Sequence, residues 1–384
     1  MEEGLYIKYI VEVFFIAAAV AAIVAPISIK LAHKLDIIDR PRDDRRIHER
    51  PIPRFGGLSI MVGSMAAMLI PAGMNSKIQT AMIGGILMYL LGAMDDIKNL
   101  KPLAKFAGQT AIATLMYAMG IRITFMSKYI FAMPAGVNAK MILSDTFSFF
   151  ITVLWIVGIT NAVNLMDGMD GLAAGSTMIM AMSMAYVAYI HGVRLGMVPV
   201  CIALVAVAGG CAGFLPFNFY PAKTFMGDGG ALYLGYMIAV LSVISPLKRA
   251  TFVGAIIPML ALAVPIFDTA FAMLRRIARH ESIMKADKGH LHHHLLAAGF
   301  GQRRSVFIIY GIVGIMGVVS ILLSRELYID ATLLAAYAFL YLLIIVIPKR
   351  SLDKKTDKKI ANAQKAQNTE HITEEEAKNV KNVE

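Results

Sequence analysis

The stretch GMVPVCIALVAVAGGCAGFLP, residues 196–216, continues for 21 residues without a charged side chain. A helix needs about 20 mostly apolar residues to cross the hydrocarbon core of a bilayer, so this stretch is long enough to span it. The whole chain has the same character, because 58% of its 384 residues are hydrophobic and 16% are charged, whereas roughly a quarter are charged in soluble domains. The composition indicates a polytopic membrane protein and argues against a soluble domain.

Ten further runs of similar length flank this segment. The eleven predicted spans are residues 7–30, 55–72, 78–94, 104–122, 147–165, 172–190, 196–216, 230–246, 251–274, 304–324 and 328–347. Only helices and closed barrels satisfy their backbone hydrogen bonds in lipid, and these runs are too long and continuous for barrel strands. The predicted fold is therefore an all-α polytopic bundle of about eleven transmembrane helices within residues 1–348.

Lysine and arginine are distributed unevenly between the connecting segments. If the amino terminus is outside, the inner segments (30–54, 95–105, 217–229 and 275–304) hold 19 of them and the outer segments hold 9. Because basic residues favour the cytoplasmic side, we expect the carboxyl terminus to be inside. The same bias, with contacts to anionic membrane lipid, accounts for the net charge of +11 without a nucleic-acid partner. Residues 349–384 are charged and lack an apolar run, which predicts a disordered or loosely helical cytoplasmic tail.

The reactive polar residues fall in the predicted inner segments, where ionisable groups at a membrane boundary suggest function. Asp95 and Asp96 end the third run. Two adjacent carboxylates become favourable when a cation or a proton lies between them, although they could equally be solvated at a helix end.

The segment NAVNLMDGMDGL, residues 161–172, follows the fifth run. If it is helical, Asn164, Asp167 and Asp170 share one face. Its glycines allow a tight turn or a close approach of a ligand to the backbone. We interpret this short acidic segment as functional.

The segment FNFYPAKTFMGDGGALYLG, residues 217–235, contains Asp228 just before an apolar run. Free N–H groups at the start of a helix suit a phosphate, and a carboxylate suits Mg²⁺. Phe225 offers a flat face on which a base can stack. Taken alone, however, GDGG is more often a turn than a site.

Two further inner segments are rich in histidine and arginine. The segment DKGHLHHHLLAAGF, residues 287–300, carries His290, His292 and His293 beside Lys288. Its spacing differs from that of zinc proteases, and imidazoles among lysines suit a pyrophosphate at least as well. The segment DDRRIHERPIPRFGG, residues 43–57, could simply anchor the chain at the membrane, but its prolines and glycines fix a loop shape.

Five ordered motifs now carry a resemblance. They are IHERPIPRFGG (47–57), MDDIKNLKP (94–102), NAVNLMDGMDGLAAG (161–175), FMGDGGALYLG (225–235) and ADKGHLHHHLL (286–296). Over roughly residues 5–347 the chain resembles the polyprenyl-phosphate N-acetylhexosamine-1-phosphate transferases of glycosyltransferase family 4, which start O-antigen, teichoic acid and peptidoglycan synthesis. The resemblance implies that the phosphate of undecaprenyl phosphate attacks the β-phosphorus of a UDP-sugar, giving undecaprenyl-pyrophosphoryl sugar and UMP. Such a transfer needs alignment and charge neutralisation.

The resemblance also implies roles for individual residues. Asp95, Asp96 and Asp228 would be catalytic, with Asp228 and Asp167 binding Mg²⁺ or, alternatively, Mn²⁺. Asp95 would position the lipid phosphate or accept its proton. The expected substrate contacts are Asn164, Asp167, Asp170, Asn218, Phe225 (stacked on uracil), His290, His292, His293, His48 and Arg54.

The chain departs from the family pattern at Asn99, where many members have a third acid. This puts in doubt any role of that acid in metal binding. The forms of the motifs around His48 and His290 resemble the branch that uses UDP-GlcNAc, and a phospho-MurNAc-pentapeptide transferase is the alternative. The resemblance further suggests a bacterial cytoplasmic membrane and a homodimer.

Two other classes of protein stay open on the sequence alone. A transporter of a phosphorylated solute should show inverted repeats and charges at the membrane midplane, whereas the acids here lie near one face. An intramembrane zinc hydrolase would use the histidines as metal ligands. We rank both below the transferase.

Overall fold

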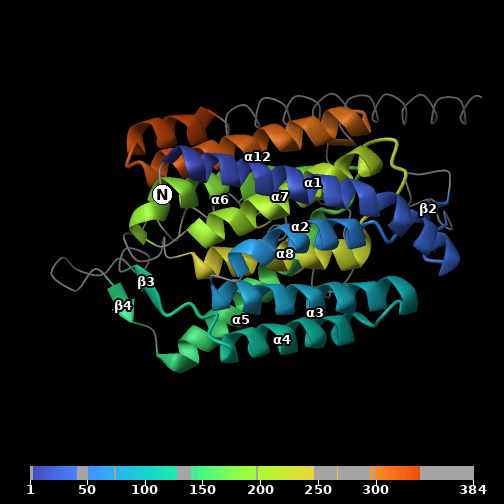
Figure 1. The fold of residues 1–384 in the computed structure, drawn as a ribbon, viewed down its shortest axis with the longest axis horizontal. Coiled ribbons are helices and arrows are strands. Elements are labelled where there is room, and N and C mark those ends of the chain that lie inside the picture. The colour runs from blue at the N-terminus through green and yellow to red at the C-terminus, as the bar shows by residue number, and fades with distance from the viewer. Residues whose placement is uncertain are drawn as a thin grey trace, which may run out of the picture.

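The computed structural model describes residues 3–40, 51–72, 75–127, 140–142, 144–195, 198–245, 266, 295–296 and 299–337. The helices of this part of the chain lie side by side in one bundle (Figure 1). They are α1 (Glu3–Lys34), α2 (Gly57–Ala72), α3 (Ser76–Lys98), α4 (Pro102–Ala118), α5 (Asp145–Met166), α6 (Leu172–Leu195), α7 (Val198–Asn218), α8 (Gly227–Ile244) and α12 (Gln302–Ser324).

The all-α class predicted from the sequence is confirmed. Seven of the described helices are long and apolar enough to cross a membrane, namely α1, α3, α5, α6, α7, α8 and α12. Helices α2 and α4 also coincide with predicted runs but are shorter. The predicted run 251–274 lies outside the described residues apart from Ile266, and the run 328–347 is described only as far as residue 337. The total of eleven spans therefore stays a prediction.

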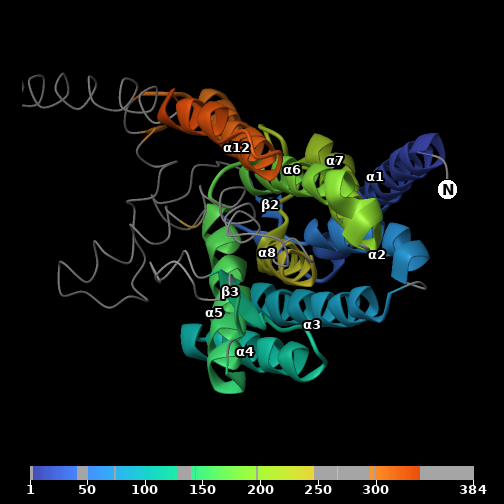
Figure 2. The ribbon, with the colours of Figure 1, turned by 90° about the vertical axis from the view of Figure 1, so that its left-hand side faces the viewer.

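Helix α8 forms the centre of the bundle (Figure 2). It packs against α2, α3 and α5, and 89% of its membrane-length segment is buried. Two hydroxyl contacts join it to its neighbours. Tyr233 and Ser64 share a hydrogen bond of 2.6 Å between their hydroxyl oxygens, and Trp155 Nε1 donates to Ser242 Oγ at 2.9 Å. These contacts pair two polar side chains of α8 with α2 and α5, whereas the Tyr236 hydroxyl on the same helix is buried without a hydrogen-bond partner among the described residues.

Small residues allow α2 and α8 to approach closely. A Cβ atom added to Gly57 would collide with the backbone of Gly230, and one added to Gly230 would lie 2.7 Å from the Cα of Gly57. Lipid supplies no hydrophobic force that draws helices together, so close packing of small residues has to do so. This contact holds the first turn of α8, and therefore Asp228, against the start of α2.

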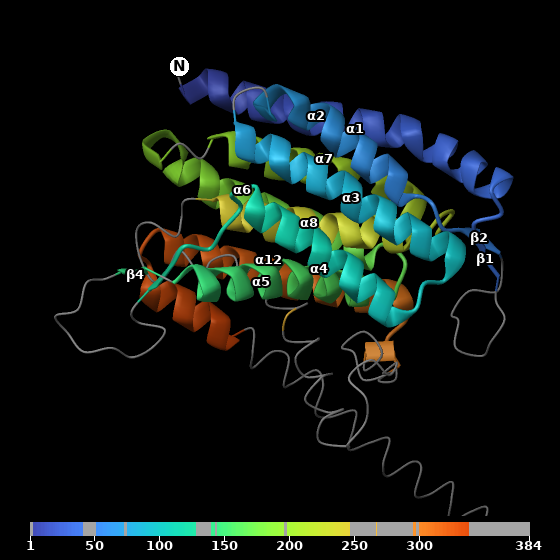
Figure 3. The ribbon, with the colours of Figure 1, turned by 90° about the horizontal axis from the view of Figure 1, so that it is seen from below.

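The described parts of the predicted inner segments 30–54, 95–105 and 217–229 lie at one end of the bundle (Figure 3). Short connections bring together the last turns of α3, α5 and α7 and the first turns of α2, α4, α6 and α8. Strands β1 (Ile38–Asp39) and β2 (Ile52–Pro53) pair antiparallel at this end. The opposite end carries the pair β3 (Phe125–Ser127) and β4 (Lys140–Ile142). The alternating helix directions thus gather the described polar motifs, around Arg54, Asp95, Asp167 and Asp228, at a single end.

Candidate active site

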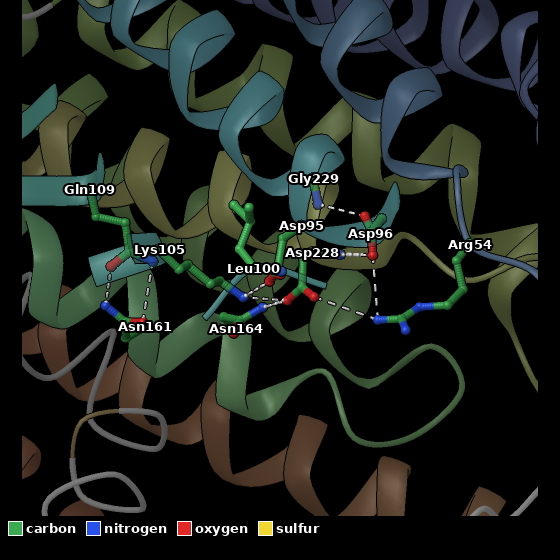
Figure 4. Close-up of polar contacts among 10 residues, drawn as sticks. All are labelled: Arg54, Asp95, Asp96, Leu100, Lys105, Gln109, Asn161, Asn164, Asp228 and Gly229. Carbon is green, nitrogen blue, oxygen red and sulfur yellow. Dashed lines mark hydrogen bonds and ion pairs between the residues drawn. The ribbon is translucent and has the colours of Figure 1, made fainter. Parts of the chain in front are cut away.

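Asp228, in the first turn of α8, is the centre of a polar cluster (Figure 4). Its Oδ1 atom accepts hydrogen bonds from Lys105 Nζ at 2.8 Å and from Asn164 Nδ2 at 2.7 Å. Its Oδ2 atom lies 3.6 Å from Arg54 Nη2. The segment that precedes α2, the first turn of α4, the last turn of α5 and the first turn of α8 therefore converge on one carboxylate.

Lys105 joins Asp228 to the acidic pair at the end of α3. Its Nζ atom is 2.8 Å from Asp95 Oδ2 and 2.8 Å from Asp228 Oδ1, and its side chain is 16% exposed. From the sequence, Lys105 is predicted only as one of the inner basic residues and has no site role. The available signal was its place inside the apolar run 104–122, because an ionisable residue within a span suggests function.

Asp96 holds the first turn of α8. Its side chain is 1% exposed, and it accepts hydrogen bonds from the backbone N–H groups of Asp228 and Gly229, each at 3.0 Å. A negative charge at this position is also stabilised by the positive amino-terminal end of the helix dipole. The Asp96 carboxylate thus occupies two of the N–H groups at the start of α8, and phosphate binding at this helix start stays a prediction.

The turn before Asp228 depends on Gly227. Its φ is +70°, a left-handed conformation that favours glycine. A Cβ atom here would also lie 2.5 Å from Asp96 Oδ2 and 2.6 Å from the carbonyl oxygen of Arg54. The glycine before Asp228 is thus needed for both backbone shape and space, which separates this GDGG from an ordinary exposed turn.

Asp95 and Asn99 end helix α3. Asp95 Oδ1 accepts from the backbone N–H of Leu100 at 2.8 Å, which leaves Oδ2 for Lys105. Asn99 is the C-cap of α3 with φ of 49°, and its side chain is exposed. Asparagine tolerates this left-handed conformation better than most residues. The departure from the family's third acid thus has a structural use as a helix cap.

The segment 167–171 forms a loop, so the helical alternative for Asp167 and Asp170 is wrong. Helix α5 ends at Met166 and α6 begins at Leu172. Asp167 is the C-cap of α5, and burial, together with the charge of Asp228, raises the pKa of its carboxyl to about 7. Asp167 therefore belongs electrostatically to the same cluster as Asp228.

Asp170 and Asn218 connect loops in this structure. Asp170 Oδ2 accepts from the backbone N–H of Ala222 at 3.0 Å. The Asn218 side chain is 2% exposed; it accepts from the N–H of Gly171 at 3.1 Å and donates to the carbonyl of Thr224 at 2.9 Å. The substrate contacts predicted for Asp170 and Asn218 stay predictions. The hydrogen bonds show that both residues hold the loop after α5 against the segment that follows α7.

Arg54 and Phe225 lie on two backbone segments that pair with each other. The N–H of Phe225 donates to the carbonyl of Pro53 at 2.8 Å, and the N–H of Gly56 donates to the carbonyl of Phe225 at 2.9 Å. Arg54 extends from this pairing to within 3.4 Å of Asp96 Oδ1. The Phe225 side chain is half-buried, and its stacking on a base stays a prediction.

Known proteins resemble the chain over most of its length. Residues 78–246, which include Asp95, Asp96, Lys105 and Asp228, match the model of glycosyl transferase family 4. A probable undecaprenyl-phosphate N-acetylglucosaminyl 1-phosphate transferase of Bacillus subtilis is 37% identical over 342 residues, covering 88% of this chain and 89% of that protein. The chain belongs to glycosyl transferase family 4. This membership, with the apolar helices, makes it a multi-pass membrane protein of a family whose named relatives are polyprenyl-phosphate sugar-phosphate transferases.

Other members of family 4 are similar over somewhat less of the chain. A decaprenyl-phosphate N-acetylglucosaminephosphotransferase of Mycobacterium leprae is 34% identical, covering 74% of this chain and 76% of that protein. A phospho-N-acetylmuramoyl-pentapeptide-transferase of Desulforudis audaxviator is 31% identical, covering 76% of this chain and 91% of that protein. The two relatives with N-acetylglucosamine in their names are thus more similar to this chain than the pentapeptide transferase is.

Several residues assigned from the family resemblance are not placed by the structure. His48, His290, His292 and His293 lie outside the described residues. Within the described ranges, no group of three or more histidine, cysteine, aspartate or glutamate side chains is arranged to hold a metal ion. The predicted pair Asp228 and Asp167 would therefore need oxygen atoms from another source to complete a coordination sphere.

Proposed function

We propose that this protein transfers N-acetylglucosamine 1-phosphate from UDP-GlcNAc to undecaprenyl phosphate, giving undecaprenyl-pyrophosphoryl-GlcNAc and UMP. An oxygen of the lipid phosphate forms a bond to the β-phosphorus. The bond between that phosphorus and the bridging oxygen breaks, and UMP leaves with this oxygen. The downstream product would be a cell-envelope polysaccharide.

The observation that carries the proposal is the set of cations around Asp228. Lys105 lies between Asp95 and Asp228, while Arg54 reaches both Asp228 and Asp96. Phosphoryl transfer requires little covalent chemistry from the protein and depends on positioning and on stabilising charge. Two cations and three acids at one end of an apolar bundle supply these means beside the membrane surface.

The donor set around Asp228 fits Mg²⁺. This ion is usually held by one or two carboxylates together with substrate phosphates and water, so Asp228 and Asp167 would be enough once the nucleotide is bound. The side chain of Asp167 has no protein hydrogen bond among the described contacts, and burial, with the charge of Asp228 adding to it, raises the pKa of its carboxyl. When bound, Mg²⁺ would neutralise charge on the pyrophosphate.

The protein's own residues would then act in three ways. Lys105 and Arg54 would balance the charge of the phosphates and of the leaving UMP, because both already lie against Asp228. Asp95 would position the lipid phosphate or accept its proton. Phe225 would stack on the uracil ring, and the histidines would contact the pyrophosphate and sugar. Asp96 would act indirectly, by fixing the turn that carries Asp228.

The choice of N-acetylglucosamine is supported by the similarity of this chain to relatives that have this sugar in their names. The relatives named for N-acetylglucosamine are 33–37% identical, whereas the pentapeptide transferases are 28–31% identical. We further propose that the site faces the cytoplasm of a bacterium, because the described site end carries Arg54, Lys98, Lys101 and Lys105 and basic residues favour that side.

The test is release of UMP by the purified full-length protein in detergent, given undecaprenyl phosphate and Mg²⁺. UDP-GlcNAc and UDP-MurNAc-pentapeptide are supplied separately, with Asp228→Asn as the control variant. We expect release with UDP-GlcNAc alone and its loss in Asp228→Asn. Release only with the pentapeptide donor would keep the reaction type and refute the sugar, while no release with any UDP-N-acetylhexosamine would refute the transferase.

A further inference from the structure

Two amide side chains, Gln109 of α4 and Asn161 of α5, form a reciprocal pair within the bundle (Figure 4). Asn161 Nδ2 donates to Gln109 Oε1 at 2.5 Å, and Gln109 Nε2 donates to Asn161 Oδ1 at 3.4 Å. Asn161 Nδ2 also donates to the carbonyl of Val157 at 2.8 Å. The side chain of Gln109 is fully buried.

The pair lies one helical turn from the two groups that meet on Asp228. Gln109 follows Lys105 by four residues on α4, and Asn161 precedes Asn164 by three residues on α5. Residues at these spacings lie on the same face of a helix. Lys105 and Asn164 both donate to the same Oδ1 atom, at 2.8 and 2.7 Å. The two helices are thus joined by two successive polar connections.

Helix α4 brings only Lys105 into the cluster, so the place of that ammonium group depends on how α4 is held. The helix packs mainly against α3 and α5. A slip by one residue would move Lys105 by about 1.5 Å along the axis and turn it by about 100°. Apart from the amide pair, the described hydrogen bond between α4 and α5 is that of Tyr117 with the carbonyl of Asp145, at the far end and exposed.

We propose that Gln109 and Asn161 are positioning residues: their amide pair fixes the register of α4 against α5 and so holds Lys105 and Asn164 on one oxygen of Asp228. This inference rests on the proposed function for its kinetic consequence. Directional hydrogen bonds suit this task, because apolar side chains in lipid specify register weakly and buried amides specify it well.

A simpler role is also testable. The pair could merely satisfy two buried amides, each of which is costly to leave unpaired. The two roles differ in the double variant Gln109→Met/Asn161→Leu, which keeps similar volumes and removes both amides together. A pair that only stabilises becomes dispensable in this variant, whereas a positioning pair does not.

The experiment compares Gln109→Met, Asn161→Leu, the double variant and the control Tyr117→Phe in the full-length protein. Three quantities are measured: kcat for UMP release, the midpoint of thermal unfolding, and the rate of acylation of Lys105 relative to exposed Lys101 by peptide mass spectrometry. A displacement near 1 Å commonly lowers a rate by about 100-fold. We therefore expect kcat to fall about 10- to 100-fold in the single variants, with Lys105 acylated several times faster.

The double variant decides between the two roles. We expect its unfolding midpoint to return toward that of the wild type while kcat stays low and Lys105 stays reactive; Tyr117→Phe should keep kcat within about twofold. Recovery of kcat and of Lys105 protection along with the midpoint would overturn the proposal. So would unchanged Lys105 acylation in the single variants.

Failure of the proposed function can be told apart from failure of this inference. If the wild type releases no UMP, the acylation of Lys105 still reports whether the amide pair holds it. If the single variants do not fold, the exchanged pair Gln109→Asn/Asn161→Gln keeps a reciprocal amide contact and should keep Lys105 protected. A folded exchanged pair with a reactive Lys105 would contradict the proposal.

Discussion

Replacement of Lys105 by methionine should be among the most damaging single changes in the site. The Lys105 ammonium lies 2.8 Å from Asp95 and 2.8 Å from Asp228, whose side chains are 12% and 22% exposed. Removing one partner of a buried ion pair typically costs about 3 to 5 kcal/mol, because the remaining charge stays buried. Arg54 and Asn164 still partner Asp228, so we expect a loss of about 3 kcal/mol, at the lower end of that range.

The assay combines thermal unfolding of the detergent-purified protein with kcat for UMP release. A loss of this size should lower the unfolding midpoint by roughly 5 °C. The double variant Lys105→Met/Asp95→Asn should recover part of this decrease, because it removes the charge of Asp95, the carboxylate that loses its cation. We expect kcat to fall at least about 100-fold in both variants. The matched control is Lys101→Met, since Lys101 is exposed at the start of the same helix. An unfolding midpoint and a kcat for Lys105→Met equal to those of the control would refute this reasoning.

Three further predictions follow from the loop between α5 and α6 and from the packing of α8. Because the pKa of Asp167 is raised to about 7, a proton competes with the metal below that pH, and the affinity for Mg²⁺, measured by calorimetry, should be about tenfold weaker at pH 6 than at pH 8. An equal affinity at both pH values, or the same pH dependence in Asp167→Asn, would contradict this prediction. Tyr310 donates a 2.5 Å hydrogen bond to a carbonyl of that loop, so Tyr310→Phe should cost about 1 kcal/mol and lower kcat severalfold, and an unchanged kcat would show that the loop needs no such support. Gly57→Val should prevent recovery of monodisperse protein in size-exclusion chromatography, because its Cβ would collide with Gly230, whereas the Cβ of Gly158→Ala meets open space and this control should behave as the wild type. Recovery of folded Gly57→Val would contradict the close packing of α2 on α8.

The sequence was sufficient to predict the helical bundle. Runs of about 20 apolar residues leave few structural choices in lipid, and runs such as 78–94 and 147–165 lie within α3 and α5. The gathering of Asp95, Asp96 and Asp228 at one end followed from counting spans, since alternate connections must lie on the same side of a membrane. The short strands β1 and β2 gave no such signal, because a two-residue pairing has no periodicity.

The contacts inside the site could not be predicted in the same way. Asp96 looked equivalent to Asp95 in the sequence, yet it caps α8 and only Asp95 meets Lys105. This difference depends on how α3 is rotated against α8, which no local pattern records. Lys105 was missed because a lysine at the predicted inner end of a span is usually an anchor. Its partner Asp228 lies 123 residues away in the chain.

The most direct test of the central claim follows the β-phosphorus of the donor. The purified protein would be given undecaprenyl phosphate, Mg²⁺ and UDP-GlcNAc labelled with ³²P in its β-phosphate, and the lipid and aqueous phases would then be separated. Transfer of the sugar together with its phosphate predicts that the label enters the lipid phase while the released nucleotide is unlabelled UMP, and that Asp228→Asn transfers none. Label recovered in the aqueous phase as UDP, beside a lipid that carries the sugar without the label, would contradict the account.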